Sequence, residues 1–101
     1  MEIFVGIKKV KSAKNIFYYF VQTEDFNGAH FLVKINPLKK TIVIFKDQNS
    51  ESPLHTLDLT KKSYKGLSIP GINLRVLPYV ILKIKNALKE NYFPDILDYC
   101  A

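Results

Sequence analysis

Residues 16–23 constrain the fold more than any other part of the sequence, because this run is apolar on nearly both of its faces. In an extended strand, alternate side chains would point to opposite sides, with Phe17, Tyr19 and Val21 on one face and Ile16, Tyr18 and Phe20 on the other. A strand of this kind belongs in the middle of a sheet, or it presents aromatic rings to a ligand. One helix can cover only one face of a sheet, so the second apolar face of this strand needs a separate explanation.

Further apolar or alternating runs predict strands before and after residues 16–23 in the chain. They span residues 2–10, 30–35 and 41–46, with a weaker run at 54–59. Asn27-Gly28 supplies the positive backbone dihedrals of a hairpin turn, and Pro37 interrupts the ladder between the third and fourth strands. Short strands joined by tight turns predict an antiparallel meander of four to five strands.

After residue 60 the hydrophobic period changes from that of a strand to that of a helix. Apolar residues recur at three- and four-residue steps at Leu77, Ile81, Ile84 and Leu88. Proline suits the first helical position, so we expect this helix to begin at Pro78 and to end before Pro94, with a short turn over 95–100. The resulting expectation is an α+β fold, in which the meander packs on one long C-terminal helix and residues 1–101 form a single domain.

Composition excludes several classes of protein. Cys100 is the single cysteine, so it cannot form an internal disulfide, and with two histidines it cannot complete a four-ligand zinc site. The N-terminus lacks the basic region of a signal peptide, and the longest apolar stretch, residues 76–82, is far shorter than the roughly 20 residues that cross a bilayer. We therefore expect a cytoplasmic protein with no cofactor, metal or membrane partner.

Catalytic motifs are absent from the sequence, so we expect a binding domain and not an enzyme. The serines belong to no nucleophile motif, and the four glycines are too scattered to form a phosphate-binding loop. An alternative enzyme could be built on Glu24, Asp25 and His30, and it requires these three side chains to converge in one pocket. Carboxylates beside a hairpin turn more often only solvate the loop.

The net charge of +6 is unevenly distributed along the chain. Residues 1–46 carry eight cations and three acids, residues 47–60 carry three acids and no lysine or arginine, and residues 61–89 carry seven cations and no acid. Arg75 is the only arginine among the fifteen cations, a bias that AT-rich codon usage also produces. The overall charge alone therefore does not identify an anionic partner.

The position of the cations relative to the aromatic residues is more informative than their number. Aromatic rings stack on the bases of single-stranded nucleic acid, while lysines on neighbouring strands contact its phosphates. The sequence therefore predicts a non-enzymatic, single-strand-binding face. Its candidate residues are Tyr18, Phe20, Lys34, Lys39, Lys40, Lys46, Lys8 and Lys9.

Several segments resemble the PUR-repeat family and its Whirly-like relatives, which are single-strand-binding proteins built from a sheet and a helix. The resemblance is carried by residues 18–21, 24–28, 31–35 and 67–70. It implies that Tyr18, Phe20, Lys34 and neighbouring lysines contact nucleic acid, and that the chain forms a homodimer through its helix.

A protein partner is the main alternative to nucleic acid. A small single domain without a catalytic motif is equally typical of an inhibitor, such as a bacterial toxin immunity protein or an antitoxin. In that case the aromatic surface would be a binding hot spot, and the acidic segment 47–60 would face a basic partner.

Overall fold

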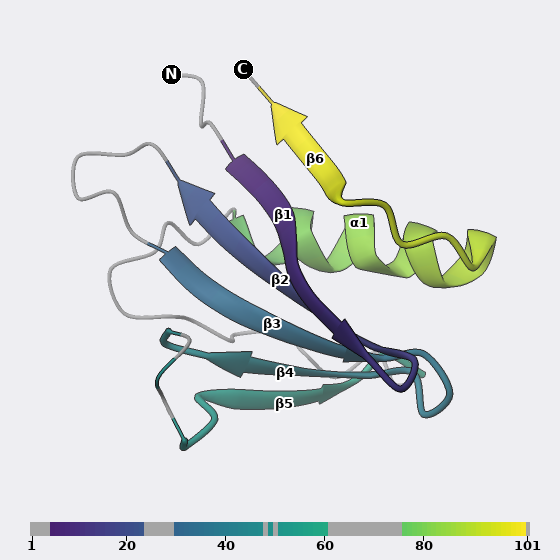
Figure 1. Cartoon of the computed structure of the whole chain (residues 1–101), viewed down its shortest axis with the longest axis horizontal. Helices are drawn as coiled ribbons and strands as arrows, with labels where there is room; N and C mark the ends of the chain where they lie inside the picture. The colour runs from purple at the N-terminus through teal and green to yellow at the C-terminus, as the bar shows by residue number, and fades with distance from the viewer. Residues whose placement is uncertain (1–4, 24–29, 48, 50, 61–75, 101) are drawn as a thin grey trace.

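The computed structural model of the chain describes residues 5–23, 30–47, 49, 51–60 and 76–100. Its elements, in chain order, are β1 (Val5–Ala13), β2 (Ile16–Thr23), β3 (His30–Asn36), β4 (Thr41–Phe45), β5 (His55–Asp58), α1 (Val76–Glu90) and β6 (Ile96–Cys100). The strands form one antiparallel sheet in the order β5-β4-β3-β2-β1-β6, and α1 lies behind this sheet in Figure 1. The expected α+β class is confirmed.

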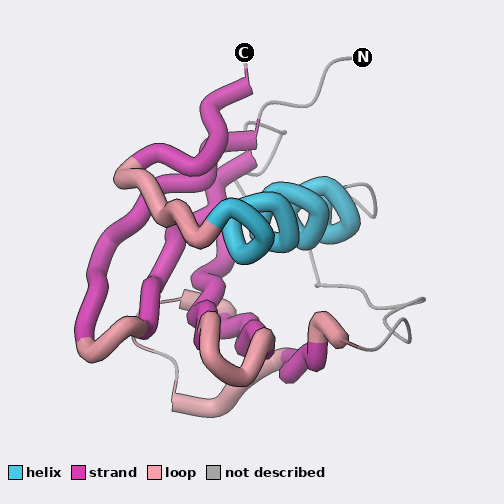
Figure 2. Tube along the Cα trace, turned by 90° about the vertical axis from the view of Figure 1, so that its right-hand side faces the viewer, coloured by secondary structure: helices cyan, strands magenta, loops and turns pink. Residues whose placement is uncertain are grey.

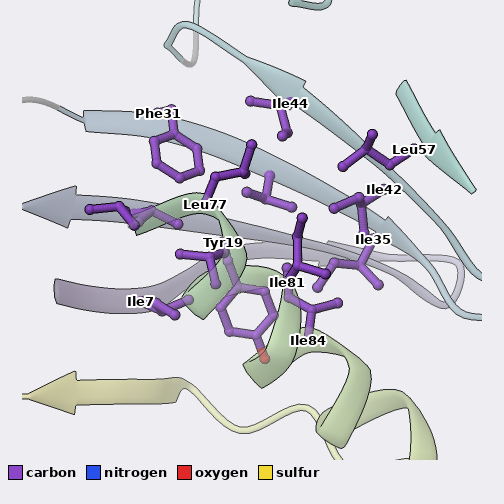
Figure 3. Packing of buried hydrophobic residues seen from close by; sticks show 14 of the residues in the cluster. Ile7, Tyr19, Phe31, Ile35, Ile42, Ile44, Leu57, Leu77, Ile81 and Ile84 are labelled. Carbon is purple, nitrogen blue, oxygen red and sulfur yellow. The ribbon is translucent and has the colours of Figure 1, made fainter. Parts of the chain in front are cut away.

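The helix α1 lies against one face of the sheet (Figure 2), and the hydrophobic core lies between them. Every second residue of the central strands turns toward the helix, as the alternation of a pleated strand requires. Figure 3 shows these side chains meeting the buried face of α1. The fully buried members of this cluster are Ile7, Tyr19, Val21, Phe31, Val33, Ile35, Ile42, Ile44, Val80 and Ile84.

The helix begins earlier than the sequence predicted. Pro78 is the third residue of α1 and not the first, because Val76 and Leu77 are already helical and buried. The first four N–H groups of a helix have no partner within it, so a proline in the first turn removes no helical hydrogen bond. The burial of Val76 and Leu77 therefore extends the helix toward its N-terminus at no cost in hydrogen bonding.

The helix ends where a left-handed residue stops it. Asn91 has a φ of 52°, and the N–H of Tyr92 donates to the carbonyl of Ala87 at 3.1 Å, while the N–H of Asn91 donates to that of Leu88 at 3.3 Å. These two bonds form a Schellman motif, which satisfies carbonyls that the helix itself leaves free. The chain then reverses and returns to the sheet.

The expectation of a C-terminal turn was wrong, and so was the number of strands. Residues 96–100 form β6, a sixth strand that pairs with β1 at the edge of the sheet, so α1 is not the last element. Local sequence shows little of this, because a five-residue edge strand is specified mainly by its distant partner.

Two irregularities shape β1. The strand runs on to Ala13, since Lys14 and Asn15, with φ values of 51° and 65°, make a two-residue turn of the type that suits a hairpin. Between Lys9 and Lys11 the register with β2 shifts, so Val10 is the extra residue of a β-bulge. The bulge determines which β1 side chains face the helix and which face away from it.

Shortening a core residue of α1 should destabilise the protein, whereas shortening an outward residue of the same helix should not. Ile84 is fully buried, so Ile84→Ala should lower the free energy of unfolding by about 2–5 kcal/mol. Leu82, which is 55% exposed, is the matched control, and Leu82→Ala should change stability by less than about 0.5 kcal/mol. Urea unfolding followed by circular dichroism measures both, and equal losses would contradict the described orientation of α1.

Candidate functional site

The sheet face opposite α1, which we call the open face, is not covered by any of the described elements (Figures 1 and 2). Strand pairing arranges its side chains in rows that cross the strands. The first row contains Ile96, Lys8, Phe20, Leu32 and Phe45. The second row contains Lys11, Tyr18, Lys34, Val43 and Thr56. Aromatic and cationic residues are therefore direct neighbours on adjacent strands.

Contacts within the open face hold its rings in place. The Lys11 ammonium lies 5.6 Å from the centre of the Tyr18 ring, a cation–π distance. The ring of Phe20 lies 5.2 Å from that of His30 in a tilted arrangement. Phe20 and Tyr18 are both half-buried, because side chains on the neighbouring strands flank them while their outer surfaces remain accessible. The face thus offers two supported aromatic surfaces.

Positive charge predominates on this face. Lys9 pairs with Asp95, and no ion pair joins Lys8 or Lys34 to a carboxylate within the part of the chain that the structure describes. The Asp58 carboxylate, at the β5 end of the sheet, accepts hydrogen bonds from the backbone N–H and the hydroxyl of Thr60, at 2.9 and 2.6 Å. Lys8 is exposed and Lys34 half-buried, which leaves both ammonium groups available to an anion.

The remaining lysines of the predicted site lie at the ends of the sheet. Lys39 and Lys40 occupy the turn between β3 and β4, where the Asn36 side chain accepts a hydrogen bond from the Lys39 N–H at 3.2 Å. Lys46 follows the other end of β4, so it is separated from them by the length of that strand. All three are exposed. They flank the rows of the open face and do not belong to them.

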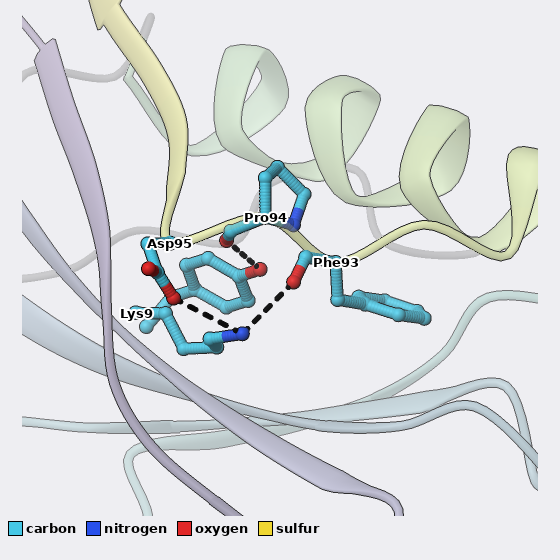
Figure 4. Close-up of polar contacts among 5 residues, drawn as sticks. Lys9, Phe93, Pro94 and Asp95 are labelled. Carbon is cyan, nitrogen blue, oxygen red and sulfur yellow. Dashed lines mark hydrogen bonds and ion pairs between the residues drawn. The ribbon is translucent and has the colours of Figure 1, made fainter.

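Lys9 is placed on the opposite side of the sheet from the other predicted site residues. Its ammonium donates to the Phe93 carbonyl at 3.0 Å and lies 3.3 Å from the Asp95 carboxylate (Figure 4). It also lies 5.7 Å from the centre of the Phe17 ring, which itself stacks on Phe93 at 4.3 Å. Lys8 and Lys9 are consecutive residues before the bulge, so the alternation of β1 already places them on opposite faces, and grouping them overlooked this.

Tyr19 completes this cluster, which we call the clasp (Lys9, Tyr19, Phe93, Pro94 and Asp95). Its buried hydroxyl donates to the Pro94 carbonyl at 2.7 Å, and the Lys9 N–H donates to the Asp95 carbonyl at 2.7 Å. Burial, followed by the nearby Asp95 charge and Tyr92, raises the pKa of Tyr19 to about 12. The clasp therefore attaches the segment between α1 and β6 to the central strands.

Of the three residues of the alternative enzyme, His30 alone belongs to the described part of the chain. Glu24 and Asp25 lie outside the described residues, and His30 lies on the open face beside Phe20. Over the part of the chain that the structure describes, no group of three His, Cys, Asp or Glu residues is arranged to hold a metal ion.

Two residues of the open face were missed by the sequence analysis. Ile96 stands opposite Lys8 on β6, a segment that was expected to be a turn. Val10 was expected to be the last residue of its strand, but it is the extra residue of the bulge. Their exposed fractions are 57% and 45%. The alternation of Ile96 with Leu97, which packs on the core, was the only local signal for the orientation of β6.

The chain matches no family model, no curated protein and no solved structure. The resemblance to PUR-repeat and Whirly-like domains, the homodimer and the identity of the partner therefore stay predictions. Within the described residues, no helix is both long enough and apolar enough to span a membrane.

The Tyr19 hydroxyl should stabilise the fold in a pH-dependent manner. Tyr19→Phe removes the hydrogen bond to Pro94, which should cost about 1 kcal/mol near pH 7. The folded protein retains the Tyr19 proton up to about pH 12, whereas the unfolded chain loses it near pH 10.0. The full stabilisation by the Tyr19 hydroxyl is thus present below pH 10. It declines between pH 10 and pH 12, because in that range the unfolded state binds fewer protons than the folded state.

Urea unfolding at several pH values measures this effect. The stability advantage of the wild type over Tyr19→Phe should shrink steadily from pH 10 to pH 12. Tyr18→Phe is the control, because Tyr18 lies on the other face of the same strand, away from Pro94 and Asp95, and it should preserve the pH profile of the wild type. An advantage for the wild type that stays constant over this range would show that Tyr19 does not titrate as described.

Proposed function

We propose that the open face binds single-stranded nucleic acid and that the chain is a non-enzymatic binding domain. The observation that carries this proposal is the cross-strand pairing of Phe20 with Lys8 and of Tyr18 with Lys34. Bases stack on exposed aromatic rings, and phosphates are neutralised by nearby ammonium groups, so such pairs suit both parts of a nucleotide. The opposite face is occupied by α1 and cannot serve this purpose.

Unpaired bases suit this surface better than a duplex does. In a double helix the faces of the bases are stacked on one another, so rings on a sheet cannot reach them without disrupting it. Lysine binds phosphate as a point charge and lacks the rigid fork with which arginine reads guanine. Lysine contacts and ring stacking together favour binding that tolerates many sequences.

The lysines at the ends of the sheet would extend the site for longer strands. Lys39 and Lys40 lie beyond one end of β4 and Lys46 beyond the other. A strand that crosses the open face would meet additional positive charge where it leaves the rows. A cytoplasmic location, where nucleic acid is abundant and thiols stay reduced, suits a chain with a single cysteine.

Removing either ring should weaken binding to single-stranded DNA. Base–aromatic stacking contributes about 1–3 kcal/mol per base, so Tyr18→Ala and Phe20→Ala should each raise Kd about 5- to 150-fold. Tyr92→Ala, an exposed aromatic residue beyond the end of α1, is the matched control and should bind like the wild type. Fluorescence anisotropy with labelled oligonucleotides at low salt measures Kd, and no binding at micromolar protein would refute the proposal.

The lysines of the open face should account for part of the salt dependence. For single strands, log K falls with log salt by about 0.7 per phosphate contact, so Lys8→Gln and Lys34→Gln should each make this slope shallower by about 0.7. Lys89, an exposed residue in the last turn of α1, provides the control. Lys89→Gln should leave the slope unchanged, and a loss of slope equal to that of Lys8→Gln would indicate that the charge acts without a defined site.

A further inference from the structure

One margin of the open face carries two exposed aliphatic side chains beside a cation. Ile96 on β6 is 57% exposed and stands directly opposite Lys8, while Val10 on β1 is 45% exposed. Because Val10 is the extra residue of the bulge, it joins Lys11 on the side of the sheet that faces Tyr18. Ile96 and Val10 are therefore diagonal neighbours on either side of Lys8, close enough to contact one ligand.

The side chain of Ile96 is held in position although it is exposed. The next residue, Leu97, packs on the core, so the Ile96 side chain turns to the opposite face of the sheet. The Lys9 N–H binds the Asp95 carbonyl at 2.7 Å, so the clasp anchors the residue immediately before Ile96. An apolar group that is already ordered loses little conformational entropy when it contacts a ligand.

The chemistry of these neighbours narrows the choice of base. Lys8 on β1 lies between Phe20 on β2 and Ile96 on β6. A base stacked on the Phe20 ring therefore has its edge close to Lys8 and to the two aliphatic side chains. Among the unmodified bases, only thymine presents a methyl group at its edge, and aliphatic side chains recognise it by apolar contact. Uracil is otherwise identical and offers hydrogen at the same position.

Building on the proposed function, we infer that Ile96 and Val10 contact the C5-methyl group of thymine, so that the open face prefers thymine-rich single-stranded DNA to strands that contain uracil. Burial of one methyl group against exposed aliphatic surface strengthens binding about fourfold. The preference arises from β1 and β6, and the stacking on Tyr18 and Phe20 is common to both bases.

Oligo(dT) and oligo(dU) of equal length provide the test, because they share the deoxyribose backbone and differ only in the methyl group. Fluorescence anisotropy should give a Kd about fourfold or more lower for oligo(dT). The wild-type protein suffices for this comparison. The same direction is expected when oligo(5-methyl-dC) is compared with oligo(dC).

Variants locate the preference on the sheet. Ile96→Thr keeps the β-branched shape that suits a strand but replaces a methyl-bearing arm with a hydroxyl, and it should bring the ratio of the two Kd values close to one. The change should come from weaker binding of oligo(dT), with the Kd for oligo(dU) little altered. Leu82→Ala, at a position with 55% exposure on α1, is the matched control and should preserve the ratio.

The outcomes separate this inference from the function on which it rests. Equal Kd values for oligo(dT) and oligo(dU) in the wild type would overturn the thymine preference and leave single-strand binding intact. An equal loss of affinity for both oligonucleotides in Ile96→Thr would also overturn it, because Ile96 would then make only a general contact. Failure of both oligonucleotides to bind would refute the proposed function and the preference together.

Discussion

The packing of one amphipathic helix against one face of the sheet is the interaction on which the other features depend. Six strands at about 4.8 Å spacing are roughly 24 Å wide, whereas a helix with its side chains is only about 10–12 Å in diameter. α1 therefore shields only part of its face, through residues such as Val80 and Ile84, and it also contacts β6. The stacked rings of Phe17 and Phe93 and the clasp further stabilise the margin at β1 and β6.

Strand β2 connects the core to the open face. Tyr19 and Val21 are buried beneath α1, while Tyr18 and Phe20 alternate with them on the other side of the same strand. Since the period of a strand is two, the packing that fixes Tyr19 also fixes the orientation of Tyr18. Rings that project from a buried strand are thus held on rigid structure, which suits a binding surface better than a loop does.

Much of the fold could be predicted because it depends on local periodicity. The alternation in residues 16–23 and 30–35 separated the two faces of β2 and β3 without showing which of them α1 covers, and the helical spacing of Leu77, Ile81 and Ile84 identified the buried side of α1. Strand β6 was not predictable in this way. Its pairing with β1 joins residues more than 85 positions apart, and nothing within five residues encodes such a partner.

In the candidate site, too, the residues that depend on local pattern could be predicted, and those that depend on distant contacts could not. Tyr18, Phe20 and Lys34 were identified correctly as neighbours, because pairing between adjacent strands follows from the hairpin pattern. Lys9 was grouped with Lys8 although alternation places consecutive residues on opposite faces, and its acceptors at Phe93 and Asp95 lie more than 80 positions away in the chain. Ile96 was missed because its role depends on the strand opposite, not on its own neighbours.

The order of the elements along the chain has a consequence for biosynthesis. The strands β1 to β5 precede α1, so a nascent chain presents the apolar side of the meander, including Phe31, Ile35 and Ile44, before the helix that covers it has been made. Such surfaces are prone to aggregate until they are buried. The stage between the synthesis of β5 and that of α1 is thus the one at which the meander is most prone to aggregate, and β6, which follows α1, completes the sheet only later.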